Sequence, residues 1–144
     1  MEGINAKSTA MYNLVKDFKS KGIPIHGVGL QAHFELGKVP SSSNMQENIE
    51  RFAALGLEVT ITELDVRMHL PADAHKLSVQ ADNHKAVVKA CRAVPKCVGV
   101  VVWGFTDKYS WIPSAFPGMG WALLWTDTYQ KKPAYASVHD ALGP

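Results

Sequence analysis

The chain of 144 residues is 47% hydrophobic and 19% charged, and it carries a net charge of +2. This composition excludes a disordered chain, and the length is enough to bury a core. Apolar stretches such as residues 98–103 are far shorter than the roughly 18 residues of a membrane-spanning helix, so no membrane partner is expected. The lysines are scattered and are not interleaved with aromatic residues, which argues against nucleic acid as a partner. We therefore interpret residues 1–144 as a single domain.

The first half of the chain predicts two helices and two strands. A helix is expected to end near Lys21, because Gly22 can terminate it and the apolar residues before it have helical spacing: Met11, Leu14, Val15 and Phe18. Residues 23–31 predict a short buried strand. A second helix begins after an N-cap in serines 41–43 and is closed by Gly56, and residues 57–64 predict a β-branched, apolar second strand.

The second half predicts one more strand between two helices. A third helix runs from about Leu77 to Ala93, residues 98–103 form a nearly continuous apolar strand, and a long aromatic loop follows. Pro133 is placed for the first turn of a last helix that reaches Leu142. Alternating helices and buried strands are typical of an α/β fold with a parallel sheet. Three strands are too few to close an eight-stranded barrel.

Two cysteines, Cys91 and Cys97, lie where the third helix turns into the third strand. A helix end that turns directly into a strand can bring two Cα atoms within disulfide range, and a bond would suit an oxidising, extracellular setting. The alternative is a pair of small buried thiols. Residues 1–5 have neither the basic region nor the apolar core of a signal peptide.

Polar and aromatic residues gather at the carboxyl ends of the three predicted strands. They are Gln31 and His33, Glu63 and Asp65, and Trp103 and Asp107. In (β/α)8 barrels this end carries the active site, because the loops there vary while the strands hold their last residues rigidly.

Three segments resemble motifs of the glycoside hydrolase family 10 endo-β-1,4-xylanases, and they follow one another in the same order as in that family. They are residues 61–66 (ITELDV), which are similar to the family's nucleophile strand, and residues 29–33 (GLQAH) and 102–111 (VWGFTDKYSW), which are similar to its flanking strand ends. Residues 2–7 resemble the segment after the family's fifth strand, and residues 132–135 resemble the start of its last helix. The resemblance covers nearly the whole chain. It implies a partial (β/α)8 TIM barrel, containing about the last three strands and their helices.

The resemblance also implies roles for single residues. Glu63 would be the nucleophile of a retaining glycosidase, with His33 hydrogen-bonded to it and Asp65 orienting that histidine. Gln31 would contact sugar hydroxyls, and Trp103 and Trp111 would stack on xylose rings. Structural alternatives remain for two of them: His33 as a satisfied core histidine, and Asp65 as a cap of the next loop. No cofactor is implied, and the histidines show no spacing typical of a metal site.

The family places its general acid/base in an Asn-Glu dipeptide on the fourth strand, and this chain contains no Asn-Glu. We therefore expect weak or no activity on xylan from the chain alone, and residual activity on an aryl xyloside that needs little protonation. Three hypotheses follow: a piece of a secreted xylanase completed by an N-terminal barrel complement, a non-catalytic xylan-binding fragment, and a self-associating half-barrel that forms a homo-oligomer. A phosphate-binding barrel is disfavoured, because no glycine-rich turn follows Trp103.

Overall fold

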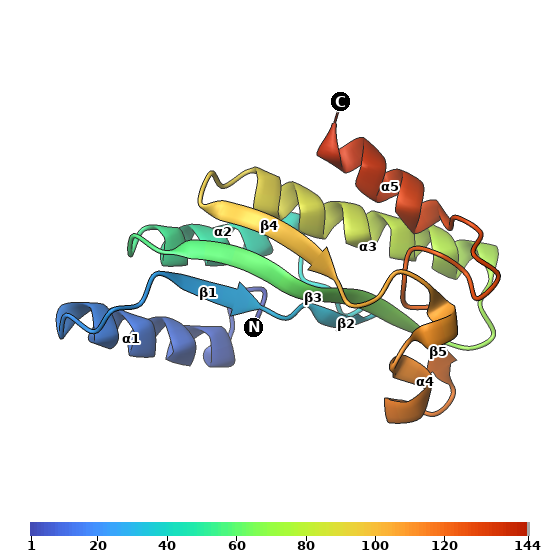
Figure 1. Cartoon of the computed structure of the whole chain (residues 1–144), viewed down its shortest axis with the longest axis horizontal. Helices are drawn as coiled ribbons and strands as arrows, with labels where there is room; N and C mark the ends of the chain where they lie inside the picture. Colours follow the sequence, from blue (N-terminus) through green and yellow to red (C-terminus); the bar gives the residue numbers. More distant parts are fainter. Residues whose placement is uncertain (144) are drawn as a thin grey trace.

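The computed structural model describes residues 1–143, which form an open α/β fold. Figure 1 shows the strands Gly27–Leu30, Glu58–His69 and Cys97–Val102 side by side, with the helices Ser42–Ala53 and Ala74–Arg92 behind them. The elements, in chain order, are α1 (Ala6–Ser20), β1 (Gly27–Leu30), β2 (His33–Glu35), α2 (Ser42–Ala53), β3 (Glu58–His69), α3 (Ala74–Arg92), β4 (Cys97–Val102), the 3-10 turn η1 (Asp107–Tyr109), α4 (Ile112–Ala115), β5 (Met119–Gly120) and α5 (Pro133–Leu142).

Strand β3 is the centre of the sheet. It pairs in parallel with β1 and β2 on one side and with β4 on the other, and β5 adds a short antiparallel pair near its end. The sheet has five strands and is not closed into a barrel. The predicted α/β class, with parallel strands of a partial barrel, is therefore confirmed.

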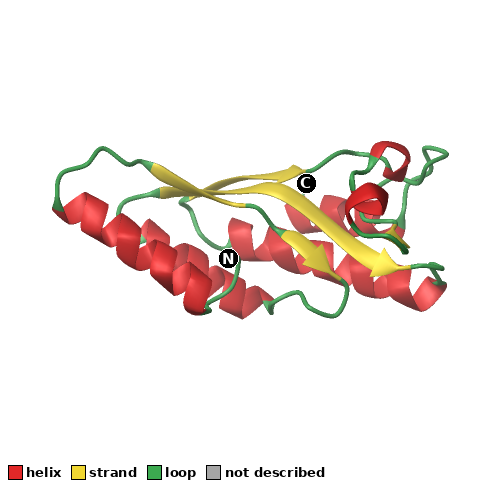
Figure 2. Ribbon diagram, turned by 90° about the horizontal axis from the view of Figure 1, so that it is seen from below, coloured by secondary structure: helices red, strands yellow, loops and turns green. Residues whose placement is uncertain are grey.

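The helices cover one face of the sheet. In Figure 2, α1, α2 and α3 lie along one side of the long strands, whose opposite side is free of helices over most of its length. The main core lies between these layers and includes Leu30, Phe52, Ile61 and Val87, each at most 2% exposed. Burial of such side chains contributes about 1.5–3 kcal/mol each.

The helix boundaries follow local capping chemistry. Asn5 and Ser8 form a capping box at the start of α1, and Ser41 caps α2, as the serine cluster predicts. Helix α3 begins three residues earlier than the predicted Leu77, because the Asp73 carboxylate accepts the Lys76 N–H. Pro133 is the first residue of α5, as predicted.

Two predicted strand boundaries were wrong. The first predicted strand, 23–31, is extended only over β1, and a second short strand, β2, begins at His33 after Ala32, whose φ is +66°. The second predicted strand continues beyond Leu64 to His69, because its last third pairs with β2 and β5. Glu63 and Asp65 therefore lie inside a strand, and Asp65 does not cap a loop.

The helix α3 and the strand β4 are joined by a covalent link. Cys91 and Cys97 form a disulfide bond with their Cα atoms 5.2 Å apart, as their position between helix and strand suggested. Within residues 1–143, no helix is both long and apolar enough to cross a membrane.

Candidate active site

Strand β3 contains one more residue than either neighbouring strand in its middle. The Cα partners of Ile61 and Asp65 are Leu30 and His33, so four steps along β3 face three steps along the β1–β2 side. On the β4 side the register also shifts, between Ile61 and Leu64. An extra residue of this kind is a β-bulge, and a one-residue shift moves the following side chains to the opposite face of a sheet.

The bulge determines which way Glu63 points. Before it, Val59 and Ile61 are buried on the helix side, whereas after it the fully buried apolar residues are Leu64, Val66 and Met68. Glu63 therefore shares a face with Asp65, away from the helix-covered core. A bulge next to a functional side chain is a common way to aim it.

His33 joins the two carboxylates of β3. Its Nε2 lies 2.9 Å from Glu63 Oε2, and its Nδ1 lies 2.8 Å from Asp65 Oδ2. Because an ionised carboxylate can only accept hydrogen bonds, the ring donates at both nitrogens when both acids are ionised. The predicted contacts of His33 with Glu63 and Asp65 are thus present in the structure, and each would fix the ring orientation.

Asp65 is fully buried beside this histidine. Its Oδ2 also accepts a hydrogen bond of 2.9 Å from Trp111 Nε1, and its Oδ1 has no partner. Burial raises the pKa of Asp65 above its usual range, although the contacts with Trp111 and His33 and the charge of Arg67 oppose this shift. Asp65 therefore holds the ring of His33 and the indole of Trp111 from inside the protein, whereas the Glu63 side chain is 23% exposed.

Two tryptophans lie beside His33, and one glutamine precedes it in the chain. The ring of Trp111 lies edge-on to His33 with centroids 4.9 Å apart, and Trp103 lies edge-on at 6.3 Å. Trp103 is 48% and Trp111 36% exposed. Gln31 is exposed and lies two residues before His33. The structure thus brings the predicted site residues Glu63, Asp65, Trp103 and Trp111 together around His33.

Two residues that sequence reasoning missed, Arg67 and Phe116, pack next to Trp111. The guanidinium of Arg67 lies 4.1 Å from the centre of the Phe116 ring, and Phe116 packs edge-on against Trp111 at 5.6 Å. Arg67 also donates to the Phe34 carbonyl. A cation over an aromatic ring contributes about 0.5–2 kcal/mol. The residue spacing gave no signal for these contacts, because Phe116 comes from a distant loop.

Asp107, the other polar residue expected near the third strand end, forms a buried ion pair with Lys132. Its Oδ2 lies 2.9 Å from Lys132 Nζ, and its Oδ1 accepts the Leu123 N–H at 2.9 Å. Lys132 also donates to the Trp121 carbonyl at 2.7 Å. Burial raises the pKa of Asp107 and lowers that of Lys132, in each case against the attraction between the two charges. The pair ties the aromatic loop that carries Trp111 to the start of α5.

The site contains acids, an imidazole and aromatic rings. Within residues 1–143, no three His, Cys, Asp or Glu side chains come together in a way that would hold a metal ion. A partly exposed carboxylate, hydrogen-bonded to an imidazole that lies beside two indole rings, is thus held on the face of β3 opposite the helix-covered core.

Comparison with known proteins identifies the family. Residues 1–141 match the model of glycosyl hydrolase family 10, and the chain belongs to this family. It is 49% identical to an endo-1,4-beta-xylanase of Agaricus bisporus. The aligned 140 residues cover 97% of this chain and 41% of that protein. It is 45% identical over 143 residues to endo-1,4-beta-xylanase A of Phanerodontia chrysosporium, which covers 99% of this chain and 35% of that protein. The chain thus spans about two fifths of the length of these curated relatives.

Solved structures show the same arrangement of elements. A glycosylated family 10 endo-beta-1,4-xylanase from Gloeophyllum trabeum superimposes with a TM-score of 0.92 at 44% identity, over 98% of this chain and 44% of that one. A family 10 xylanase from Bispora sp. MEY-1, solved with xylobiose, gives a TM-score of 0.94 at 42% identity, over 97% of this chain and 44% of that one. The open sheet is therefore similar to one part of these enzymes.

Proposed function

We propose that this chain supplies the nucleophile-bearing part of a retaining endo-1,4-β-xylanase site. The observation that carries the proposal is the contact of 2.9 Å between His33 Nε2 and Glu63 Oε2, at the partly exposed end of the hydrogen-bonded group Glu63–His33–Asp65. Family membership adds support, because the similar proteins of Agaricus bisporus and Phanerodontia chrysosporium are endo-1,4-beta-xylanases. The substrate class proposed is xylan or xylo-oligosaccharide.

In this proposal Glu63 attacks the anomeric carbon of a β-xyloside while the glycosidic bond breaks and the aglycone leaves on its oxygen; water then hydrolyses the resulting glycosyl-enzyme intermediate. The contact with His33 Nε2 would hold the Glu63 carboxylate in position for this attack. Trp103 and Trp111 offer flat apolar surfaces for xylose rings, and Gln31 is free to contact sugar hydroxyls. Asp65 orients His33 and takes no direct part in bond making.

The general acid is the missing part of the proposed site. Retaining cleavage requires a second carboxyl about 5–5.5 Å from the nucleophile. Asp65 is unsuited to this role, because it is fully buried and its Oδ2 is occupied by His33 and Trp111. Glu58 lies at the opposite, exposed end of β3. The acid would come from an N-terminal barrel complement, and the chain alone would act only on substrates with good leaving groups.

The test uses the purified chain and two matched variants. Glu63→Gln removes the charge of the proposed nucleophile, and Glu58→Gln makes the same change on the same strand, away from His33. We expect slow release of nitrophenol from an aryl β-xylobioside by the parent and by Glu58→Gln, and none by Glu63→Gln. Soluble xylan, run in parallel, should not be cleaved. Equal release by all three proteins, or by none, would overturn the role of Glu63 in this chain.

A second candidate function is xylan binding without cleavage. The exposure of Trp103 and Trp111 beside a carboxylate favours it, because indole faces stack on sugars whether or not an acid is present. Titration with xylobiose, followed by tryptophan fluorescence, separates the candidates: binding without nitrophenol release supports this one.

Light scattering tests the third hypothesis, a self-associating half-barrel. The disulfide bond agrees with an extracellular location, which we propose for the protein.

A further inference from the structure

The backbone just before His33 adopts an unfavourable conformation. Ala32 has a φ of +66° and is fully buried, between Gln31 and His33. Residues with a Cβ rarely occupy this left-handed region, and when they do the surroundings must hold them there. Because Ala32 separates β1 from β2, its conformation sets the direction in which the chain enters β2 and therefore where His33 points.

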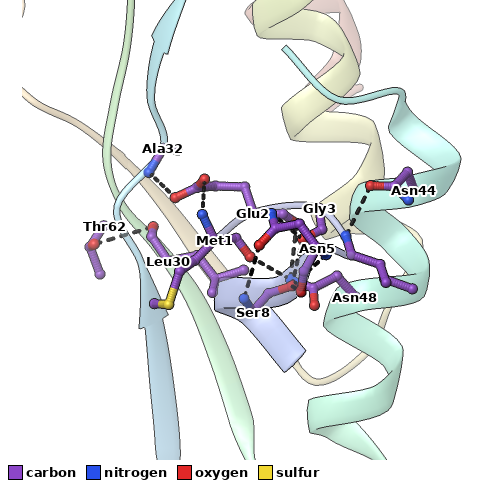
Figure 3. A network of polar contacts seen from close by, with 11 residues as sticks. Met1, Glu2, Gly3, Asn5, Ser8, Leu30, Ala32, Asn44, Asn48 and Thr62 are labelled. Carbon is purple, nitrogen blue, oxygen red and sulfur yellow. Dashed lines mark hydrogen bonds and ion pairs between the residues drawn. The ribbon is translucent and has the colours of Figure 1, made fainter. Parts of the chain in front are cut away.

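Both polar backbone groups of Ala32 are held by residues distant in sequence. Its N–H donates to Glu2 Oε1 over 2.9 Å, a contact drawn at the left of Figure 3, and its carbonyl accepts the Asp65 N–H at 3.2 Å. The second bond belongs to the pairing of β2 with β3. The first comes from a side chain outside the sheet, and it is charge-assisted because the Glu2 carboxylate is an ionised acceptor at neutral pH.

Glu2 is itself held in place. The side-chain amide of Asn48, a fully buried residue of α2, donates to the carbonyls of Met1 at 2.8 Å and Glu2 at 3.0 Å (Figure 3). The next residue, Gly3, has no room for a Cβ against Asn44 and Pro40. The backbone of Glu2 is therefore fixed against α2, so its side chain reaches Ala32 from a rigid base.

The electrostatics of Glu2 agree with a charged acceptor. Burial raises the pKa of Glu2, but the amine of Met1 and the Ala32 N–H outweigh this effect and leave it below its usual range. The amine contacts Oε2, whereas Oε1 accepts from Ala32. The Met1 amine and the Ala32 N–H therefore bind different oxygens of the Glu2 carboxylate and do not compete.

We infer that Glu2 is a positioning residue for the site: its carboxylate holds the left-handed backbone at Ala32 and thereby places His33 between Glu63 and Asp65. This role rests on the proposed function only in that His33 acts on Glu63. The placement of His33 by Glu2 does not depend on catalysis, because it is a property of the protein without substrate.

The experiment compares ring-proton NMR signals of His33, assigned with a His33→Gln variant, in Glu2→Ala, Glu2→Ala/Ala32→Gly and the control Glu47→Ala. Glu47 is exposed on α2. Hydrogen-bonded ring protons exchange slowly with water, so we expect their exchange to be about tenfold faster, or the signals to disappear, in Glu2→Ala. Glycine adopts a positive φ without penalty, so the double variant should recover the signals. A role of Glu2 in packing alone would not be rescued at position 32.

Each outcome decides the inference. Signals in Glu2→Ala that match the control would overturn it, and so would a double variant that is no better than Glu2→Ala, including the case in which both fail to fold. Recovery in the double variant supports it even when Glu2→Ala alone does not fold. The NMR measurement needs no substrate. It can therefore succeed while Glu63→Gln retains nitrophenol release, in which case only the proposed function fails.

Discussion

Removal of one partner of the buried Asp107–Lys132 pair should destabilise the fold strongly. The two side chains are 7% and 1% exposed, and the charged atoms are 2.9 Å apart. In Asp107→Ala the Lys132 ammonium stays buried, with the Trp121 carbonyl as its remaining acceptor, and the Leu123 N–H loses its partner. A buried charge left without its partner costs about 3–5 kcal/mol, and we expect the free energy of unfolding to fall by that amount.

The double variant Asp107→Ala/Lys132→Met should lose less than the sum of the two single variants. No buried charge remains in it, and the Trp121 carbonyl still accepts from the Gln80 side chain. The main residual cost is the unpaired Leu123 N–H, about 1–3 kcal/mol. We therefore expect a coupling energy of at least about 2 kcal/mol between positions 107 and 132.

Urea unfolding at pH 7, followed by tryptophan fluorescence, measures these differences. Asp127→Ala is the matched control, because Asp127 is an exposed aspartate of the same loop, and its effect should stay within about 0.5 kcal/mol. Additive losses in the double variant would refute the reasoning, since they would mean that the two charges are stabilised independently of each other.

Three further predictions concern pH and redox conditions. Burial raises the pKa of Asp65, so the contribution of Asp65 to stability is present below its usual pKa and is lost as pH rises through the raised value. The unfolding free energy of the parent minus that of Asp65→Asn should therefore decline from pH 3 to 7. A difference that does not change with pH would contradict this prediction. Burial, aided by the charge of Lys132, lowers the pKa of His84 from 6.5 to about 4, so stability is lost as pH falls through this window; relative to pH 7, His84→Leu should lose about 3 kcal/mol less than the parent by pH 4 in urea titrations, and equal losses would count against it. The disulfide closes a loop with a sequence separation of 6, so dithiothreitol should lower the unfolding free energy by about 2 kcal/mol and should have no effect on Cys91→Ala/Cys97→Ala.

Much of the fold was predictable from local sequence. The helices α1, α2 and α5 were placed by their apolar spacing, by caps at Ser41 and Pro133, and by Gly56, whose φ of +81° suits a helix end. These signals act over a few residues, so they can be seen without the tertiary structure. The motif around Glu63 was equally local.

The strand ends were less predictable, because partners define them. Residues 65–69 of β3 are extended since β2 and β5 pair with them, and β2 has only three residues of its own. The alternation of polar and apolar residues along β3 breaks at the bulge. The buried apolar residues have odd numbers up to Ile61 and even numbers from Leu64 onwards. Sequence alone gave Glu63 as a candidate but not the face on which it lies.

The class of fold, the helix caps and the residue types of the site can be predicted from the chain alone, because spacing and side-chain chemistry are properties of neighbouring residues. The way the site is held becomes visible only in three dimensions: Glu2 bonded to the left-handed Ala32, Arg67 over the Phe116 ring that packs on Trp111, and the ion pair of the aromatic loop. Glu2 and Ala32 are 30 positions apart in the chain. Contacts of this kind depend on the packing of whole elements, whose relative placement no short stretch of sequence encodes.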